Sequence, residues 1–588
     1  MNTRFKFWPW LVLLTLPWLL LLPLLLTGTL SYRHDTWFHL MRIYEIRQAM
    51  LHQALPTLGS WFTFGQAGQL IQGLYPSQTL LPLVAITNWL APVQQVYCIF
   101  GLILCAIAAS NYLVFKASHL TTNQALLAAL TVTYSIPLIN LLVYGQLPLA
   151  LVFIFMPPIF WSLYQLQTNT PHPATATVLG LNIGLTLLTH LPSAFILILL
   201  VVLIAGLDLI SHRHRFLSFV QAGCWALGIG LPTLVTILVA SSQTLAVAKV
   251  AQRSFFQWGQ LFEEHWHHLG IGPYFGYTPL TLLALTYLAL TLWRHDNWRP
   301  LKIASLTLFF IYGSNLTLQP LIELVQFPQR FYLYSAQLAI FICLVRLCQQ
   351  PLGKGVSTIF YIVLASVTLF SAAKTVFHVH QQLQAQTTWQ AQPGYHRRLT
   401  KITNQTYQQP AFINMRTYRD YLPIEQAPYV KAGKKAFFAS EYARDVNQAH
   451  SVRPSHFSGN DLHLDKTQPT DFASPVTVNP PKRQHSVPNG IDLWVHLPKS
   501  GHYDLPIWQY HYLSYQVFDN GQPRISRVSK QGRLQLKLQA GDHHLQIRLL
   551  LPTWLLAAYL TSATSLALLG LYLLCQKRPP YKSKNKAG

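Results

Sequence analysis

Long apolar runs recur through most of this chain, and they decide what it can fold into. A helix of roughly 20 apolar residues crosses a bilayer core about 30 Å thick. The first such run covers residues 7–30, and eleven further windows are centred near residues 105, 132, 156, 182, 201, 229, 285, 310, 340, 366 and 563. Only 10% of the 588 residues are charged, whereas a soluble domain carries about 25%. The sequence therefore predicts a polytopic α-helical membrane protein with about twelve transmembrane helices.

Basic residues beside the apolar runs predict which loops face the cytoplasm. They gather in three segments, at 211–215, at 294–302 and in the tail after residue 576. Two more precede the run 7–30, which we interpret as a retained first span with a cytoplasmic N-terminus. Both termini on one side require an even number of crossings. The weaker apolar stretch 74–90, which contains Pro76 and Pro82, is therefore predicted to lie at the outer membrane surface without crossing.

This multi-pass topology in the cell membrane divides the chain into three parts. Residues 1–376 would form the transmembrane module, with a long external first loop at 31–92. Residues 377–550 would form an extracytoplasmic domain. Residues 551–588 would supply the last transmembrane helix and a basic cytoplasmic tail.

The external domain is predicted to be β-rich and sandwich-like. Residues 491–497, 534–538 and 544–550 alternate apolar and polar side chains, as strands with one buried face do. Asn520-Gly521 favours a tight hairpin turn, because both residues tolerate the positive φ that such turns need. The segment 451–488 is rich in Pro, Ser, His and Asn and is predicted to be loop.

The excess of basic residues limits which classes of partner the protein can bind. The formal net charge is +24, but the basic residues are scattered among loops instead of forming one stripe. That distribution excludes nucleic-acid binding and fits contact with membrane lipids, or a site for an anionic substrate. All six cysteines lie in apolar segments, so the external domain holds neither a disulfide framework nor a Cys-ligated zinc site. Cysteine-free external segments are typical of a bacterium with a single membrane.

Asp35 is the acid whose position is most informative, because it follows the first span by only a few residues. If a helix begins here, Asp35, His39 and Arg42 fall at i, i+4 and i+7 on one face. A carboxylate, an imidazole and a guanidinium at the outer surface could hold a phosphate and deprotonate a hydroxyl. The alternative is an N-cap Asp followed by a polar helix face at the interface.

Arg330 is the second candidate, at the end of an external loop and the start of a span. It could clamp an anion in the same outer cavity, or it could simply extend its charged end to the interface. Three further acids, Glu263, Glu264 and Glu323, are also placed outside by the topology. Histidines near Glu264 lack the helical spacing of a zinc site, so the sequence indicates no cofactor, and a divalent metal stays open.

Several motifs resemble those of the GT-C superfamily of membrane glycosyltransferases. The layout is most similar to its YfhO-like branch, which includes proteins labelled 6-pyruvoyl-tetrahydropterin synthase-related, although nothing in the sequence supports pterin chemistry. The matching segments are His34-Asp35-x-x-Phe38-His39-x-x-Arg42, Tyr75-Pro76, Gln326-Phe327-Pro328-Gln329-Arg330, Asp420-Tyr421-Leu422-Pro423, and 505–521 with its Asn-Gly turn. The resemblance covers nearly the whole chain and implies a GT-C-like fold for the transmembrane module.

The resemblance also implies an activity. It would be transfer of a sugar from a polyprenyl-phosphate donor to a cell-envelope polymer on the outer face. Asp35 would act as general base or orient the acceptor, and His34, His39, Arg42 and Arg330 would bind substrate, the arginines at the donor phosphate. Relatives often carry an Arg-Gly pair and an acid in the second external loop, but here that segment, 143–146, has neither. A second acid would then come from Glu263, Glu264 or Glu323.

Two other function classes stay open. A lipid or polysaccharide transporter or flippase predicts ionisable groups deep inside the spans, and the sequence places almost none there. A non-catalytic envelope scaffold would use the β-rich domain to bind a partner.

Overall fold

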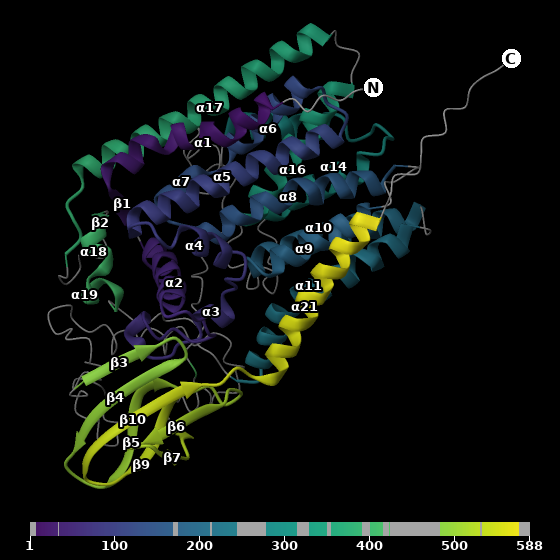
Figure 1. The fold of residues 1–588 in the computed structure, drawn as a ribbon. Helices are drawn as coiled ribbons and strands as arrows, with labels where there is room; N and C mark the ends of the chain where they lie inside the picture. Colours follow the sequence, from purple (N-terminus) through teal and green to yellow (C-terminus); the bar gives the residue numbers. More distant parts are fainter. Residues whose placement is uncertain are drawn as a thin grey trace.

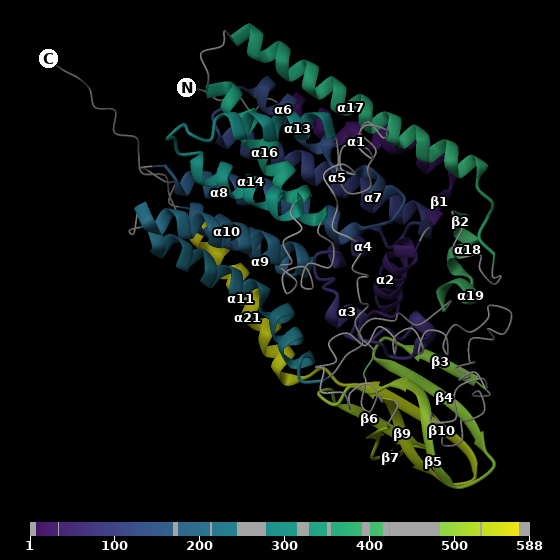
Figure 2. The same cartoon turned by 180° about the vertical axis from the view of Figure 1, so that it is seen from behind.

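The fold consists of a bundle of helices and a domain of β-strands, which Figures 1 and 2 show from opposite sides. A computed structural model describes residues 7–32, 34–168, 174–211, 215–243, 278–313, 329–349, 354–390, 400–414, 423, 483–529 and 532–575. Among these residues, helices fill the chain up to residue 385, and the last helix returns to them after the strands. The prediction of a helical part followed by a β-rich part is confirmed.

The apolar runs form the long helices. These are α1 (Trp8–Thr27), α5 (Pro92–Ala117), α6 (Thr122–Ser135), α8 (Leu147–Leu166), α9 (Thr175–Leu187), α10 (Leu191–Ser211), α11 (Phe216–Ala240), α13 (Thr278–Leu290), α14 (Arg299–Gly313), α16 (Gln329–Gln349), α17 (Lys354–Ala385) and α21 (Thr553–Cys575). Each of the twelve predicted windows lies in one of them. Within the described residues, seven are long and apolar enough to cross a membrane, namely α1, α5, α8, α11, α16, α17 and α21. The chain is a helical membrane protein, while twelve crossings and the orientation of the termini stay predictions.

Small residues let these helices approach closely. A Cβ added to Gly180 of α9 would lie 2.4 Å from the carbonyl oxygen of Ala222 in α11. The last helix, α21, packs on the other side of α11, where Ser562 donates a hydrogen bond of 2.7 Å to the carbonyl of Ile229. Figure 1 shows α21 running beside α11 back from the strands. The C-terminal end of the β-domain is thus tied to the bundle.

A two-stranded sheet joins the start of the chain to a segment far along it. β1 (Thr29–Tyr32) pairs antiparallel with β2 (Thr400–Thr403), and the short helices α18 (Asn404–Gln408) and α19 (Pro410–Ile413) follow β2. These helices pack on α2 (His34–Leu51), where Trp37 Nε1 donates to the Phe412 carbonyl at 2.7 Å. By packing, residues 400–414 belong with the helices, although the predicted division at residue 376 places them in the external domain. The difference arises because β2 has its partner strand next to the first span.

The first loop contains one helix of 18 residues, α2, and otherwise short elements. The short elements are the 3₁₀ turn η1 (Phe64–Gln66), α3 (Ile71–Leu74) and α4 (Leu81–Thr87), and a further short helix, α7 (Leu138–Leu142), lies in the second loop. The stretch 74–90, predicted to lie at the membrane surface, contains only the seven-residue helix α4. That length is far below what a span needs.

The later strands form two sheets. One has the order β3 (Arg483–Val487), β4 (Gly490–Leu497), β10 (Gly541–Leu549), β6 (Tyr515–Asp519) and β7 (Gln522–Arg524); the other has β5 (Gly501–Trp508), β9 (Arg533–Leu538) and β8 (Arg527–Val528). The three predicted strands are confirmed as β4, β9 and β10. Asn520 (φ 49°) and Gly521 (φ 79°) make the predicted turn between β6 and β7. The loop predicted for 451–488 is wrong at its end, because β3 pairs there with the edge of β4.

The two sheets share one apolar core, and the first loop takes part in it. Trp61 and Leu70 of that loop are buried with core residues of the sheets such as Leu493 and Leu536. Backbone hydrogen bonds support the contact, since Trp508 N donates to the Ala67 carbonyl at 2.9 Å. The β-domain therefore holds the part of the first loop around Trp61 and Leu70, while α2 forms the start of the same loop.

Candidate functional site

Helix α2 carries Asp35 and three of the four residues predicted to bind substrate. It begins at His34, one residue after β1 has ended. The predicted helix is confirmed, so Asp35, His39 and Arg42 occupy positions i, i+4 and i+7 along it. The side chains of His34 and Asp35 lie outside the described part of the chain, and only their place in the first turn of α2 is given.

Arg42 is held firmly by the segment that follows α3. Its side chain is fully buried, and Nη2 donates to the carbonyls of Tyr75 at 3.1 Å and Pro76 at 2.7 Å. The guanidinium also lies over the Tyr75 ring, 4.5 Å from its centroid. Such a contact is attractive because the ring face is negative. Arg42 thus joins α2 to Tyr75-Pro76.

Two buried histidines lie on either side of the same tyrosine. The His39 ring meets the Tyr75 ring edge-on at 5.8 Å, and the His190 ring is tilted against it, also at 5.8 Å. His190 Nδ1 is 2.5 Å from Ser193 Oγ. Among the described residues, His39 Nδ1 has no hydrogen-bond partner. The two imidazoles therefore come from α2 and from the turn before α10.

Burial sets the charge state of these rings. It lowers the pKa of His39 well below the usual 6.5, and the charge of Arg42 lowers that pKa further. Burial likewise lowers the pKa of His190, and the charges of Arg330 and Arg42, together with the neighbouring His39, lower it further. Both imidazoles are therefore neutral at pH 7. A neutral imidazole offers one hydrogen-bond donor and one acceptor.

Arg330 acts on the same histidine from another helix of the bundle. It lies in the first turn of α16 and is partly buried, and its charge acts on His190. Arg330, His39 and Arg42 thus all lie within electrostatic reach of His190. Glu263, Glu264 and Glu323 lie outside the described residues, so their places are not given.

The second external loop lies directly against α2. Thr36 Oγ1 donates to the Val143 carbonyl at 2.6 Å. Gly145 has a φ of +63°, and a Cβ there would be 3.9 Å from the Cβ of His39. The segment 143–146, which lacks an Arg and an acid, is thus a neutral wall beside His39.

Sequence reasoning missed His190 and Glu45. His190 gave a weak signal, as a lone histidine between two apolar runs. Glu45 is 2% exposed and lies one turn beyond Arg42. Its Oε1 accepts from Trp61 N at 2.6 Å, and its Oε2 accepts from Phe62 N at 3.0 Å and Thr63 Oγ1 at 2.7 Å. Burial raises the pKa of Glu45 to about 7, although these hydrogen bonds favour the charged form.

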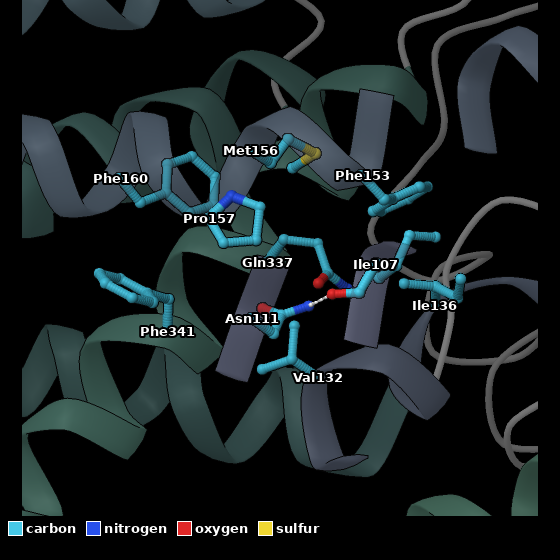
Figure 3. Close-up of a pocket in the computed structure, with 10 residues that line it drawn as sticks. All are labelled: Ile107, Asn111, Val132, Ile136, Phe153, Met156, Pro157, Phe160, Gln337 and Phe341. Atoms are coloured by element: carbon cyan, nitrogen blue, oxygen red, sulfur yellow. Dashed lines mark hydrogen bonds between the residues drawn. The ribbon is translucent and has the colours of Figure 1, made fainter. Parts of the chain in front are cut away.

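The described part of the chain forms no metal-binding cluster, and the cavity within its helix bundle is small. No group of three or more His, Cys, Asp or Glu side chains there could hold a metal ion. Figure 3 shows a small cavity between α5, α6, α8 and α16, in which Asn111 and Gln337 lie among apolar side chains. Its volume of about 10 Å³ is room for about one water. A sugar does not fit there.

Comparisons with known proteins give a distant likeness among solved structures. No family model matches the chain, and no curated protein matches it. Among solved structures, it is similar to the crystal structure of ArnT from Cupriavidus metallidurans bound to undecaprenyl phosphate, with 14% sequence identity. The match covers 63% of this chain and 75% of that chain, with a TM-score of 0.36. At this level the two folds are alike only in part, and the likeness assigns neither a residue nor an activity.

Proposed function

We propose that the chain is a membrane glycosyltransferase that moves a sugar from a polyprenyl-phosphate donor to a cell-envelope acceptor. The observation that carries this proposal is that the charges of Arg42 and Arg330 both act on His190, which is neutral, as is His39. Arg42 belongs to α2, the helix whose first turn contains Asp35. Cations for a leaving phosphate and a carboxylate for an incoming hydroxyl are what this reaction needs.

The chemistry assigns a role to each group. The bond between the anomeric carbon of the sugar and the phosphate oxygen breaks, and the acceptor oxygen forms the new bond to that carbon. Asp35 takes the proton of the acceptor hydroxyl, and Arg330 and Arg42 stabilise the negative charge that develops on the polyprenyl phosphate. His34, His39 and His190 supply hydrogen bonds to the substrate. The proposal also includes a second acid and a divalent metal, but it assigns a position to neither. The acid would be Glu263, Glu264 or Glu323.

The membrane setting supports a lipid-linked donor. One of the helices long and apolar enough to cross a bilayer, α16, carries Arg330 in its first turn. A donor with a polyprenyl tail can keep that tail in lipid while its phosphate reaches the arginines. A water-soluble donor would have no use for this placement.

The decisive variant is Asp35→Asn in full-length protein reconstituted with a polyprenyl-phosphate sugar and an envelope polymer. Loss of a general base slows transfer by about 10²–10⁴-fold, while donor binding stays unchanged. Asp542→Asn is a matched control, because that carboxylate is 75% exposed in the β-domain. If Asp35→Asn folds and transfers sugar at the wild-type rate, the catalytic role of Asp35 is wrong.

The same vesicles separate the other function classes. Movement of lipid or polysaccharide across the bilayer without any sugar transfer would replace the proposal with a transporter. Rescue of a deletion strain by the external domain alone would replace it with a scaffold. Arg330→Gln is expected to weaken donor binding in the enzyme, whereas Arg527→Gln, exposed in β8, is not.

A further inference from the structure

An open groove lies at the ends of α1 and α17, where these helices meet the sheet of β1 and β2. Its volume is about 590 Å³. One part of its lining is apolar, with Leu22 and Leu26 of α1 and Leu383 of α17. The other part is polar, with His380 and Gln384 of α17 and Lys401 of β2. Figure 1 shows α1 and α17 lying side by side up to β1 and β2.

The apolar part faces outward from the bundle. Leu22 is 43% exposed and Leu26 is 76% exposed. Both belong to α1, which is long and apolar enough to cross a membrane. Exposed leucines on such a helix meet acyl chains instead of water. This part of the groove therefore suits a hydrocarbon tail.

The polar part lies where α17 leaves its apolar stretch. The last three turns of α17 contain histidines and glutamines, which belong at the depth of lipid headgroups. Lys401 stands on a backbone that is fixed from two sides. It pairs with Ser31 across the β1–β2 sheet, its N–H donates to the Thr387 carbonyl at 3.1 Å, and its carbonyl accepts from Trp389 N at 2.9 Å. A flexible side chain with a cationic end is thus anchored at a fixed point of the rim.

We propose that this groove binds one anionic glycerophospholipid, with an acyl chain along Leu22 and Leu26 and the phosphate at Lys401 and His380. The occupant follows from charge and shape, since an apolar channel that ends at a cation matches a lipid with a net negative headgroup. A zwitterionic lipid carries its own cation, which lies close to Lys401 and weakens binding. The bound lipid joins α1, α17 and β2 at the point where β1 leads into α2. This site is separate from the proposed donor site and does not depend on the proposed function.

The test is a titration of full-length protein in detergent, read by native mass spectrometry. The probes are phosphatidylglycerol and phosphatidylcholine with identical acyl chains. Wild-type protein is expected to hold one phosphatidylglycerol about fivefold more tightly than phosphatidylcholine, since a lysine near a lipid phosphate contributes about 1 kcal/mol. Lys401→Gln removes that preference. Lys374→Gln, exposed on α17 and outside the groove lining, keeps it.

Two further arms make the result decisive. Leu26→Gln is expected to weaken binding of both lipids, because it interrupts the acyl channel. An excess of glycerol 3-phosphate should not displace the lipid; displacement would mean a site for a soluble anion and would overturn the proposal. Equal binding of the two lipids by wild-type protein, or an unchanged preference in Lys401→Gln, would overturn it as well. A monodisperse elution profile shows that each variant is folded.

Discussion

Two carboxylates in different regions are equally buried but are held in opposite ways. Glu45 of α2 and Asp519 of β6 are each 2% exposed. Glu45 accepts hydrogen bonds from two backbone N–H groups and one hydroxyl, all of them neutral. Asp519 lies 2.8 Å from His543 Nδ1 and 3.1 Å from Arg524 Nη2. The first loop is thus held by neutral donors and the β-hairpin by an ion pair.

The difference shows where the molecule stays sensitive to protons. Burying a carboxylate is costly unless its charge is compensated. The positive charge of Arg524 compensates the negative charge of Asp519. The donors to Glu45 are neutral, and burial raises the pKa of Glu45 to about 7. The loop next to the candidate site therefore depends on a group that changes charge near neutral pH, and the β-hairpin depends on a cation that does not.

The largest effect is expected from Glu45→Ala. It leaves Trp61 N, Phe62 N and Thr63 Oγ1 buried without their acceptor, and each orphaned donor costs about 1–3 kcal/mol. The first loop should then open more easily by about 3–5 kcal/mol. Hydrogen exchange of the Trp61 and Phe62 amides measures this, with a rise of at least about a hundredfold. Glu45→Gln keeps one acceptor oxygen and should show a smaller rise; equal protection in wild type and Glu45→Ala would remove Glu45 from this role.

Changing pH should act in the same place. Because folding raises the pKa of Glu45 from 4.5 to about 7, the folded loop binds the proton more tightly than the open loop. Its stability is full below pH 4.5 and falls as the pH rises through about 7, by up to about 3 kcal/mol. The readout is protection of the Phe62 amide between pH 5 and 8, corrected for intrinsic exchange. Glu45→Gln should give a flat profile, and a rise in protection with pH would contradict the shift.

A smaller effect is expected from Asp519→Asn. The amide still accepts one hydrogen bond but no longer compensates Arg524, which is about half exposed and can turn to water. We expect about 1–2 kcal/mol of lost protection in β6 and β10, on the scale of one hydrogen bond to a charged group, and none at Phe62. Asp542→Asn breaks a pair with His496 that is mostly in water and should cost under about 0.5 kcal/mol. If Asp542→Asn lost more protection than Asp519→Asn, the exposed pair would be the stronger of the two, which would contradict this prediction.

Much of the fold could be read from local pattern. Apolar runs predicted the helices because a span needs one continuous stretch, and alternation predicted β4, β9 and β10 because each buries one face. The pairing of β1 with β2 could not be predicted, because two four-residue strands separated by most of the chain carry no shared signal. β3 was missed because its side chains are mostly half exposed and do not alternate.

The candidate site was predictable along one helix and not between helices. The spacing of Asp35, His39 and Arg42 fixed their common face as soon as α2 was assumed. His190 joins them only because α9 ends beside Tyr75, which spacing does not encode. The role of Glu45 depends on backbone N–H groups sixteen residues away, and any residue can supply a backbone N–H, so no side-chain motif marks it.

The β1–β2 sheet has a consequence for how the chain is made. Trp37 and Phe412 are 375 residues apart yet share a hydrogen bond, so the ribosome releases the two halves of this junction at widely separated times. Until β2 emerges, β1 offers an open strand edge, a feature that invites wrong pairing. Every product of interrupted synthesis that stops before residue 400 carries the same open edge. All such unfinished chains share an unpaired β1, and its edge is covered only when β2 pairs with it late in synthesis.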